Sequence, residues 1–175
     1  MIAEIRKILN VFPIDPGFKF IRDDSPNAFA VAESDVPNTR GTVYIGMNLI
    51  NDEFTQDQFG GVAVAGICAH ECGHIFQYDN GYMQSLHGPT AQWIELHADY
   101  LAGFYLGRDG SHSRDHVEIF ANSLFRKGDF DFNNERHHGT PDQRVAAMRE
   151  GYGAGQAGTD VRTAAESGAS FVRAL

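Results

Sequence analysis

The chain has 175 residues, of which 42% are hydrophobic, and this size and composition predict one globular domain with its own core. Its 23 acidic residues against 14 Lys and Arg give a formal net charge of -9. An acidic chain without a cluster of basic residues argues against a nucleic acid or an anionic membrane as partner, so we expect a peptide or protein. Nothing in the sequence indicates the oligomeric state.

The N-terminal stretch MIAEIRKILNVFPIDPGF lacks the long apolar segment and the small-residue cleavage site of a signal peptide. No apolar run approaches the roughly 20 residues that cross a bilayer, so we expect no membrane span. The two cysteines, Cys68 and Cys72, lie four residues apart in a predicted helix, which suits buried free thiols better than a disulfide. Together these features favour a cytoplasmic protein.

The chain between residues 18 and 50 has the composition of β-strands. Three stretches, FKFIRDD, NAFAVAES and GTVYIGMNLI, are rich in aromatic and β-branched residues. Turn sequences, DDSPN and DVPNTRG, separate them. Strands that follow one another through turns predict a small antiparallel sheet.

From Thr55 the pattern becomes helical. Thr55 and Gln58 have the spacing of a capping box, and Asn-Gly at 80–81 is a typical helix end, so one long helix is expected between them. A second helix is expected over residues 90–106 and a third over 113–128.

The fourth helix has the clearest beginning. Thr140 is placed to cap it, Pro141 occupies its first position, and Gln143 completes a capping box. The segment 152–175 is rich in Gly, Ala and Ser, and we expect a flexible link that leads into a short final helix. The whole chain, 1–175, is therefore predicted to be a single α+β domain, with the small antiparallel sheet packed on a helical bundle.

The pentapeptide HECGH on the long helix has the spacing of a zinc site. His70 and His74 are four residues apart and lie on one helix face, where both imidazoles can bind one ion. Glu71 lies about 100° around the helix and leans over the same side, as a catalytic base would.

A catalytic zinc ion needs a third protein ligand and an open fourth position. The stretch ELHAD on the next helix offers Glu95 and Asp99, again four residues apart on one face. Glu95 is the expected third ligand, and Asp99 is expected to accept the remaining ring N–H of a ligand histidine. His97 points away from this face, and we interpret it as structural.

The two motifs resemble those of the gluzincin zinc metallopeptidases. Within that zincin-like group, NAFA, GTVYIGMNLI, HECGH, ELHADYLAG and HGTPDQR are most similar to a family of neutral zinc metallopeptidases, over roughly residues 27 to 151. The resemblance implies a minimal gluzincin fold in which the sheet packs beside the HExxH helix. It also implies that the strand GTVYIG pairs with an extended peptide substrate.

The resemblance implies Zn²⁺ as cofactor, with His70, His74 and Glu95 as ligands, Glu71 as general base and Asp99 as the residue that orients a ligand. The expected reaction is peptide-bond hydrolysis by a metal-activated water, as in a metalloendopeptidase.

A further hydrogen-bond donor to the reacting carbonyl oxygen is expected from HHGTPDQ. His138 stands just before the fourth helix, whose N-terminal dipole favours a neutral imidazole. The neighbouring His137 is the alternative donor. Two other functions stay open, a zinc-stabilised binding or regulatory domain without turnover and a zinc hydrolase that cleaves another amide; Glu71 argues against the first, since a scaffold needs no base.

Overall fold

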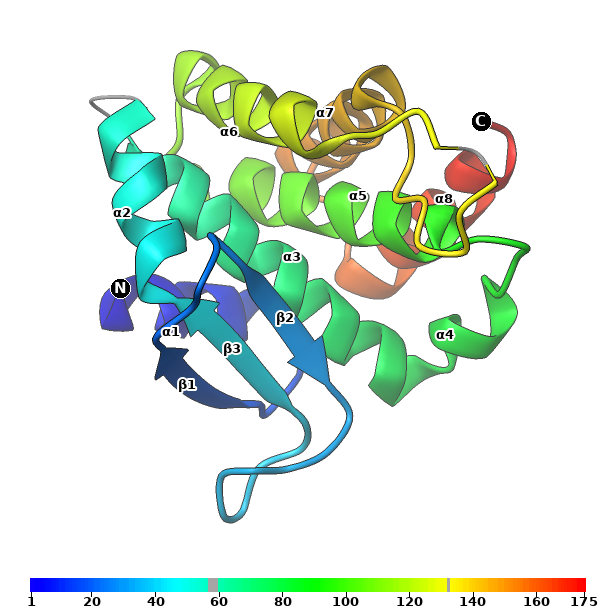
Figure 1. Ribbon diagram of the computed structural model, residues 1–175. Helices are drawn as coiled ribbons and strands as arrows, with labels where there is room; N and C mark the ends of the chain where they lie inside the picture. The colour runs from blue at the N-terminus through cyan, green and yellow to red at the C-terminus, as the bar shows by residue number, and fades with distance from the viewer. Residues whose placement is uncertain (57–59, 132) are drawn as a thin grey trace.

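A computed structural model describes residues 1–56, 60–131 and 133–175 and shows a three-stranded sheet at one side of a group of helices (Figure 1). The strands are β1 (Gly17–Ile21), β2 (Ala28–Val31) and β3 (Thr42–Gly46), and α1 (Ile2–Val11) precedes them. The remaining helices are α2 (Met47–Gln56), α3 (Gly60–Asn80), α4 (Tyr82–Ser85), α5 (Gln92–Asp109), α6 (Arg114–Lys127), α7 (Pro141–Gln156) and α8 (Val161–Arg173). The predicted α+β class is confirmed.

The sheet is mixed, and the prediction of an antiparallel sheet was wrong. Its strand order is β1-β3-β2, with β1 parallel and β2 antiparallel to β3. The reason is that β3 lies between the two earlier strands. The connection from β1 to β2 therefore passes across the position of β3 and does not form a hairpin. Because β3 is paired on both sides, it cannot pair with a peptide as the resemblance implied, and β2 is an edge strand.

The strand expected to extend to residue 50 ends at Gly46, and α2 begins at Met47. The cap of this helix comes from another part of the chain. The Asp23 carboxylate accepts hydrogen bonds from the backbone N–H of Asn48 at 2.7 Å and of Leu49 at 3.1 Å. A cap that lies far away in sequence explains why the pattern of residues 47–56 did not reveal a helix.

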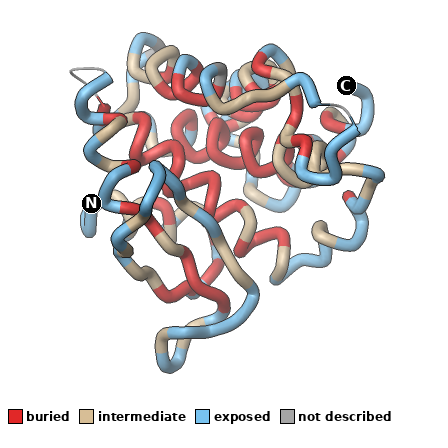
Figure 2. Tube along the Cα trace, viewed as in Figure 1, coloured by how far each residue is buried: buried red, intermediate tan, exposed pale blue. Residues whose placement is uncertain are grey.

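Thr55 does not begin the long helix as expected, because it lies inside α2 and its hydroxyl donates to the Asp52 carbonyl at 2.8 Å. Gln58, its expected partner, lies outside the described residues. The long helix α3 begins at Gly60 and ends at Asn80, as expected at its C-terminal end. Most of α3 and α5 is buried, and these two helices form the centre of the molecule (Figure 2).

The capping box at Thr140 is confirmed, because its hydroxyl accepts the Gln143 N–H while the Gln143 side chain accepts the Thr140 N–H. The helix it begins, α7, packs closely on α5. A Cβ atom at Gly103 would lie 1.9 Å from the Met148 carbonyl oxygen, and one at Gly151 would lie 1.9 Å from that of Tyr100. Only glycine allows the two backbones to approach this closely.

The C-terminal segment 152–175 is helical over most of its length, in contrast to the expected link. Residues 152–156 are the last turn of α7, and the final helix is α8. Small buried residues of α8, Ala164, Ala165 and Ala169, are part of the core. Among the residues described here, no helix combines the length and apolar character needed to cross a membrane.

Candidate metal centre

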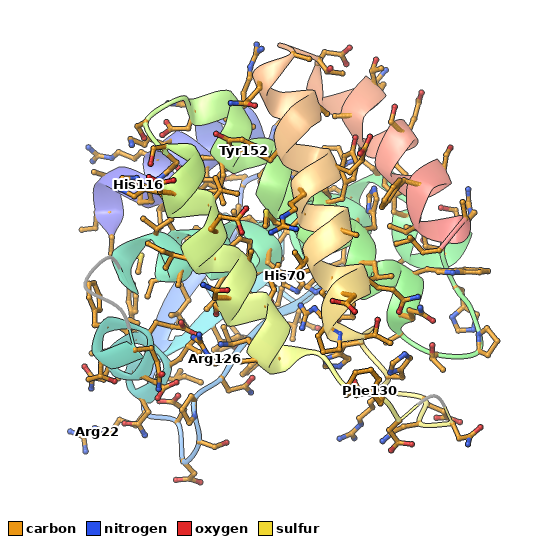
Figure 3. The ribbon with its side chains drawn as sticks, turned by 90° about the horizontal axis from the view of Figure 1, so that it is seen from above. Arg22, His70, His116, Arg126, Phe130 and Tyr152 are labelled. Carbon is orange, nitrogen blue, oxygen red and sulfur yellow. The ribbon has the colours of Figure 1, made fainter. Side chains whose placement is uncertain are left out.

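Three ligand atoms from α3 and α5 converge at the centre of the molecule, near the point where Figure 3 labels His70. The Nε2 atoms of His70 and His74 are 3.1 Å apart. The Glu95 carboxylate places Oε2 3.4 Å from Nε2 of His70 and Oε1 3.4 Å from Nε2 of His74. Two atoms bound tetrahedrally to one Zn²⁺ at about 2.0–2.1 Å lie about 3.3 Å apart, so each of these separations is close to the one that a zinc site requires.

The His70 ring is held from behind by two buried side chains. Its Nδ1 lies 2.8 Å from an Asp99 carboxylate oxygen, and Asp99 is fully buried. Arg144, from α7, donates to both oxygens of Asp99, at 2.7 Å from Nε and 2.9 Å from Nη2. The ion pair keeps Asp99 ionised, so Nδ1 of His70 donates its proton and Nε2 presents a lone pair.

His74 is held in the same way by a neutral acceptor. Its Nδ1 lies 2.8 Å from the side-chain oxygen of Gln77, one turn further along α3. With a proton on each Nδ1, the Nε2 atoms of both histidines face the Glu95 carboxylate and can present a lone pair to a metal ion. Three acceptors that face one another at this spacing repel unless a proton or a metal ion lies between them.

The charges around the three ligands favour a cation. Burial disfavours the imidazolium of His70, but the charge and hydrogen bond of Asp99 and the contact with Glu95 outweigh it and raise the pKa of His70 to about 10. Burial alone would raise the pKa of Glu95, and the nearby His74 and His70 lower it. A site that binds a proton this strongly also attracts a metal ion in its place.

Glu71 has the environment of a general base. Its side chain is buried, and this burial raises its pKa above the usual range, although the neighbouring histidines oppose the shift. A raised carboxyl pKa brings the group closer to neutral pH, where it can both accept and return a proton.

Two cavities meet at the three ligands. One, of about 230 Å³, extends under the start of β2 between α2, α3 and α6; the other, of about 370 Å³, extends along β2 toward α4. Both are lined by His70, Glu71, Glu95 and His138. The first has apolar walls formed by Leu49, Ile67, Phe120 and Leu124. The potential ligands therefore lie where the two cavities adjoin, and Ala28 of the edge strand lines both.

The structure separates the two candidate donors. His138 lines both cavities, and its backbone N–H donates to the Asp129 carboxylate at 3.1 Å. His137 is buried, lines neither cavity and pairs through Nδ1 with Asp129. Of the two histidines, His138 is therefore the one that faces the cavities.

Three residues that the sequence analysis did not assign to the metal site are not among its potential ligands in the structure. His97 is fully buried behind Gln77, and Cys68 and Cys72 are buried free thiols. The sequence missed two supporting residues, Arg144 and Gln77. Arg144 is the last residue of the quoted motif HGTPDQR, but its partner could not be read from the chain.

A second group of potential ligands, Glu4, Asp109 and His112, lies at the end of α5. The Lys7 ammonium already lies 3.4 Å from Glu4 and 3.3 Å from Asp109. This cation lies between the two carboxylates, so the group is part of a salt-bridge network between α1 and α5.

The chain matches no protein-family model, no curated protein and no solved structure.

Proposed function

We propose that the protein is a zinc-dependent metalloendopeptidase of the gluzincin type. One observation carries this proposal: the Nε2 atoms of His70 and His74 lie 3.1 Å apart, each lies 3.4 Å from an oxygen of the Glu95 carboxylate, and Glu71 is buried in the same cleft. The resemblance of HECGH and ELHADYLAG to gluzincin motifs points the same way.

Each protein group has a role in peptide hydrolysis. A zinc ion held by the three ligands would supply a Lewis acid that brings the pKa of water down to about 7. Glu71 takes the proton of the attacking water on a carboxylate oxygen and passes it to the leaving amine. His138 donates a ring N–H to the carbonyl oxygen, where negative charge develops.

The edge strand supports an extended peptide as substrate. Ala28 pairs with Ile45, so Asn27 stands opposite Gly46, and the Gly46 N–H donates to the Asn27 carbonyl at 2.9 Å. Since hydrogen-bonded and non-hydrogen-bonded positions alternate in an antiparallel pair, the backbone groups of Ala28 and Ala30 point away from β3. They are available to an added strand.

A cleft on both sides of the ligands supports cleavage within a chain. Antiparallel pairing with β2 directs the substrate's C-terminal part toward the start of β2 and the smaller cavity. The apolar walls of that cavity, including Leu49 and Leu124, suit an apolar side chain on the residue that follows the cleaved bond.

The proposal is tested by zinc analysis and peptide-library cleavage with the wild type and Glu71→Gln. We expect one zinc ion per chain in both proteins and cleavage that is slower in Glu71→Gln than in the wild type by about 10²-fold or more. Glu150→Gln is the matched control, because Glu150 is exposed on α7. A zinc-loaded wild type that cleaves nothing in a broad library would favour the silent binding domain.

A further inference from the structure

We propose that Gln77 and His97 are positioning residues that hold the metal ligand His74 in a single tautomer, and that α8 completes this arrangement through the backbone carbonyl of Ala165. The inference rests on the proposed function, because it takes His74 as a ligand. It adds a role for two buried residues and for the C-terminal helix.

The orientation of the Gln77 amide is fixed by a backbone carbonyl. Gln77 is fully buried, and its Nε2 donates to the Ile94 carbonyl at 2.8 Å. Since a carbonyl oxygen only accepts, the amide nitrogen must face Ile94 and the amide oxygen must face His74. The Nδ1 of His74, 2.8 Å from that oxygen, therefore carries the proton.

His97 satisfies the second N–H of the same amide. Its Nδ1 lies 3.0 Å from Nε2 of Gln77, and its Nε2 lies 2.9 Å from the Ala165 carbonyl oxygen of α8. The carbonyl requires a proton on Nε2, and the Gln77 amide requires a lone pair on Nδ1. Both contacts select one neutral tautomer of His97.

The chain of hydrogen bonds thus begins at two backbone carbonyls and ends at Nε2 of His74, which is left unprotonated toward Glu95. Without Gln77, either nitrogen of His74 can hold the proton, and a proton on Nε2 excludes a metal ion. Loss of such an outer hydrogen bond weakens metal binding by about 10–100-fold.

Zinc affinity measured by competition with a chromophoric chelator tests this directly. We expect Gln77→Met, which keeps the length of the side chain but not its hydrogen bonds, to bind zinc about 10–100-fold more weakly than the wild type. Asn80→Leu is the control, since Asn80 is an exposed amide on the same helix whose side chain donates to the Phe76 carbonyl at 2.8 Å. We expect its zinc affinity to be unchanged.

His97→Phe removes the link to α8 but leaves the bond between Gln77 and Ile94. We expect it to weaken zinc binding less than Gln77→Met does. Wild-type affinity in Gln77→Met overturns the inference, and wild-type affinity in His97→Phe overturns the role of His97 and α8.

A readout without metal separates this inference from the proposed function. Nitrogen-15 NMR of histidine-labelled, metal-free protein at pH 8 reports which ring nitrogen carries the proton. We expect Nδ1–H in His74 and Nε2–H in His97, with His74 losing its single tautomer in Gln77→Met. A proton on Nε2 of His74 in the wild type would overturn the inference even if peptides are cleaved, whereas the expected tautomers without zinc binding would overturn the proposed function alone.

Discussion

Arg144 and Asp99 form a two-point ion pair in the interior, in which both residues are buried and both Asp99 oxygens accept from the guanidinium, at 2.7 and 2.9 Å. The pair joins α5 to α7 directly behind His70, one of the proposed metal ligands. The guanidinium and the nearby His70 lower the pKa of Asp99 against the opposing effect of its burial.

Arg144→Met leaves the Asp99 charge buried without its partner, so we expect the free energy of unfolding to fall by about 3–5 kcal/mol. Urea denaturation measures this change in the free energy of unfolding. Arg149→Met is the control on the same helix, because Arg149 and Glu118 form an exposed pair at 2.7 Å worth at most about 1 kcal/mol. Equal losses in the two variants would show that the buried pair does not stabilise the fold.

Removal of zinc is expected to destabilise the protein. At free zinc about 1,000-fold above the dissociation constant, binding adds about 4 kcal/mol, which corresponds to a rise of roughly 10 °C in Tm for a chain of this length. Calorimetry with and without a chelator measures the shift. His74→Ala should melt at the same temperature in both conditions, and a chelator-independent Tm for the wild type would speak against a metal site.

His138→Ala removes the proposed donor to the carbonyl oxygen. We expect kcat to fall by about 10²–10³-fold at full zinc content, since this donor acts mainly when charge develops. His87→Ala, an exposed substitution, serves as the control and should keep wild-type kcat. If His137→Ala reduces kcat more than His138→Ala does, the assignment of the two residues is reversed.

Ala30→Pro tests whether a substrate pairs with β2. Ala30 is opposite Val43 at a position whose N–H points away from β3, so proline costs no bond within the sheet. Loss of one substrate hydrogen bond, worth about 1 kcal/mol, should lower kcat/KM by about 5-fold or more without changing zinc affinity. A series of peptides, each N-methylated at one backbone position, provides a second measurement. If every peptide in the series is cleaved at the same rate, pairing of the substrate with β2 is excluded.

Burial lowers the pKa of His97 to about 4, although its hydrogen bond to Ala165 raises it. The unfolded chain, with a histidine pKa of about 6.5, therefore binds this proton first as pH falls. His97 should contribute a loss of stability that begins below about pH 6.5 and reaches roughly 2–3 kcal/mol near pH 4. Urea denaturation of metal-free protein between pH 7 and 4 should show a shallower decline for His97→Phe than for the wild type, and parallel declines would refute this role.

Several features of the site follow from local spacing, which is why the sequence was sufficient to predict them. Residues four apart on a helix must share a face, so the pairs His70 and His74 and Glu95 and Asp99 were predictable without a structure. The capping box at Thr140 is also local, since its two hydrogen bonds lie within four residues.

Relations between distant segments were decided only by the tertiary structure. The sequence gives no register between α3 and α5, so the distance from Glu95 to the histidines, and the partner of Arg144, depend on how the helices pack. The edge position of β2 depends on the entry of β3 between earlier strands, and the cap of α2 comes from Asp23. Helical periodicity determines which side chains share a helix face. Only the packing of the core brings two such faces together, because the hydrophobic effect is non-directional and does not specify which distant segments meet.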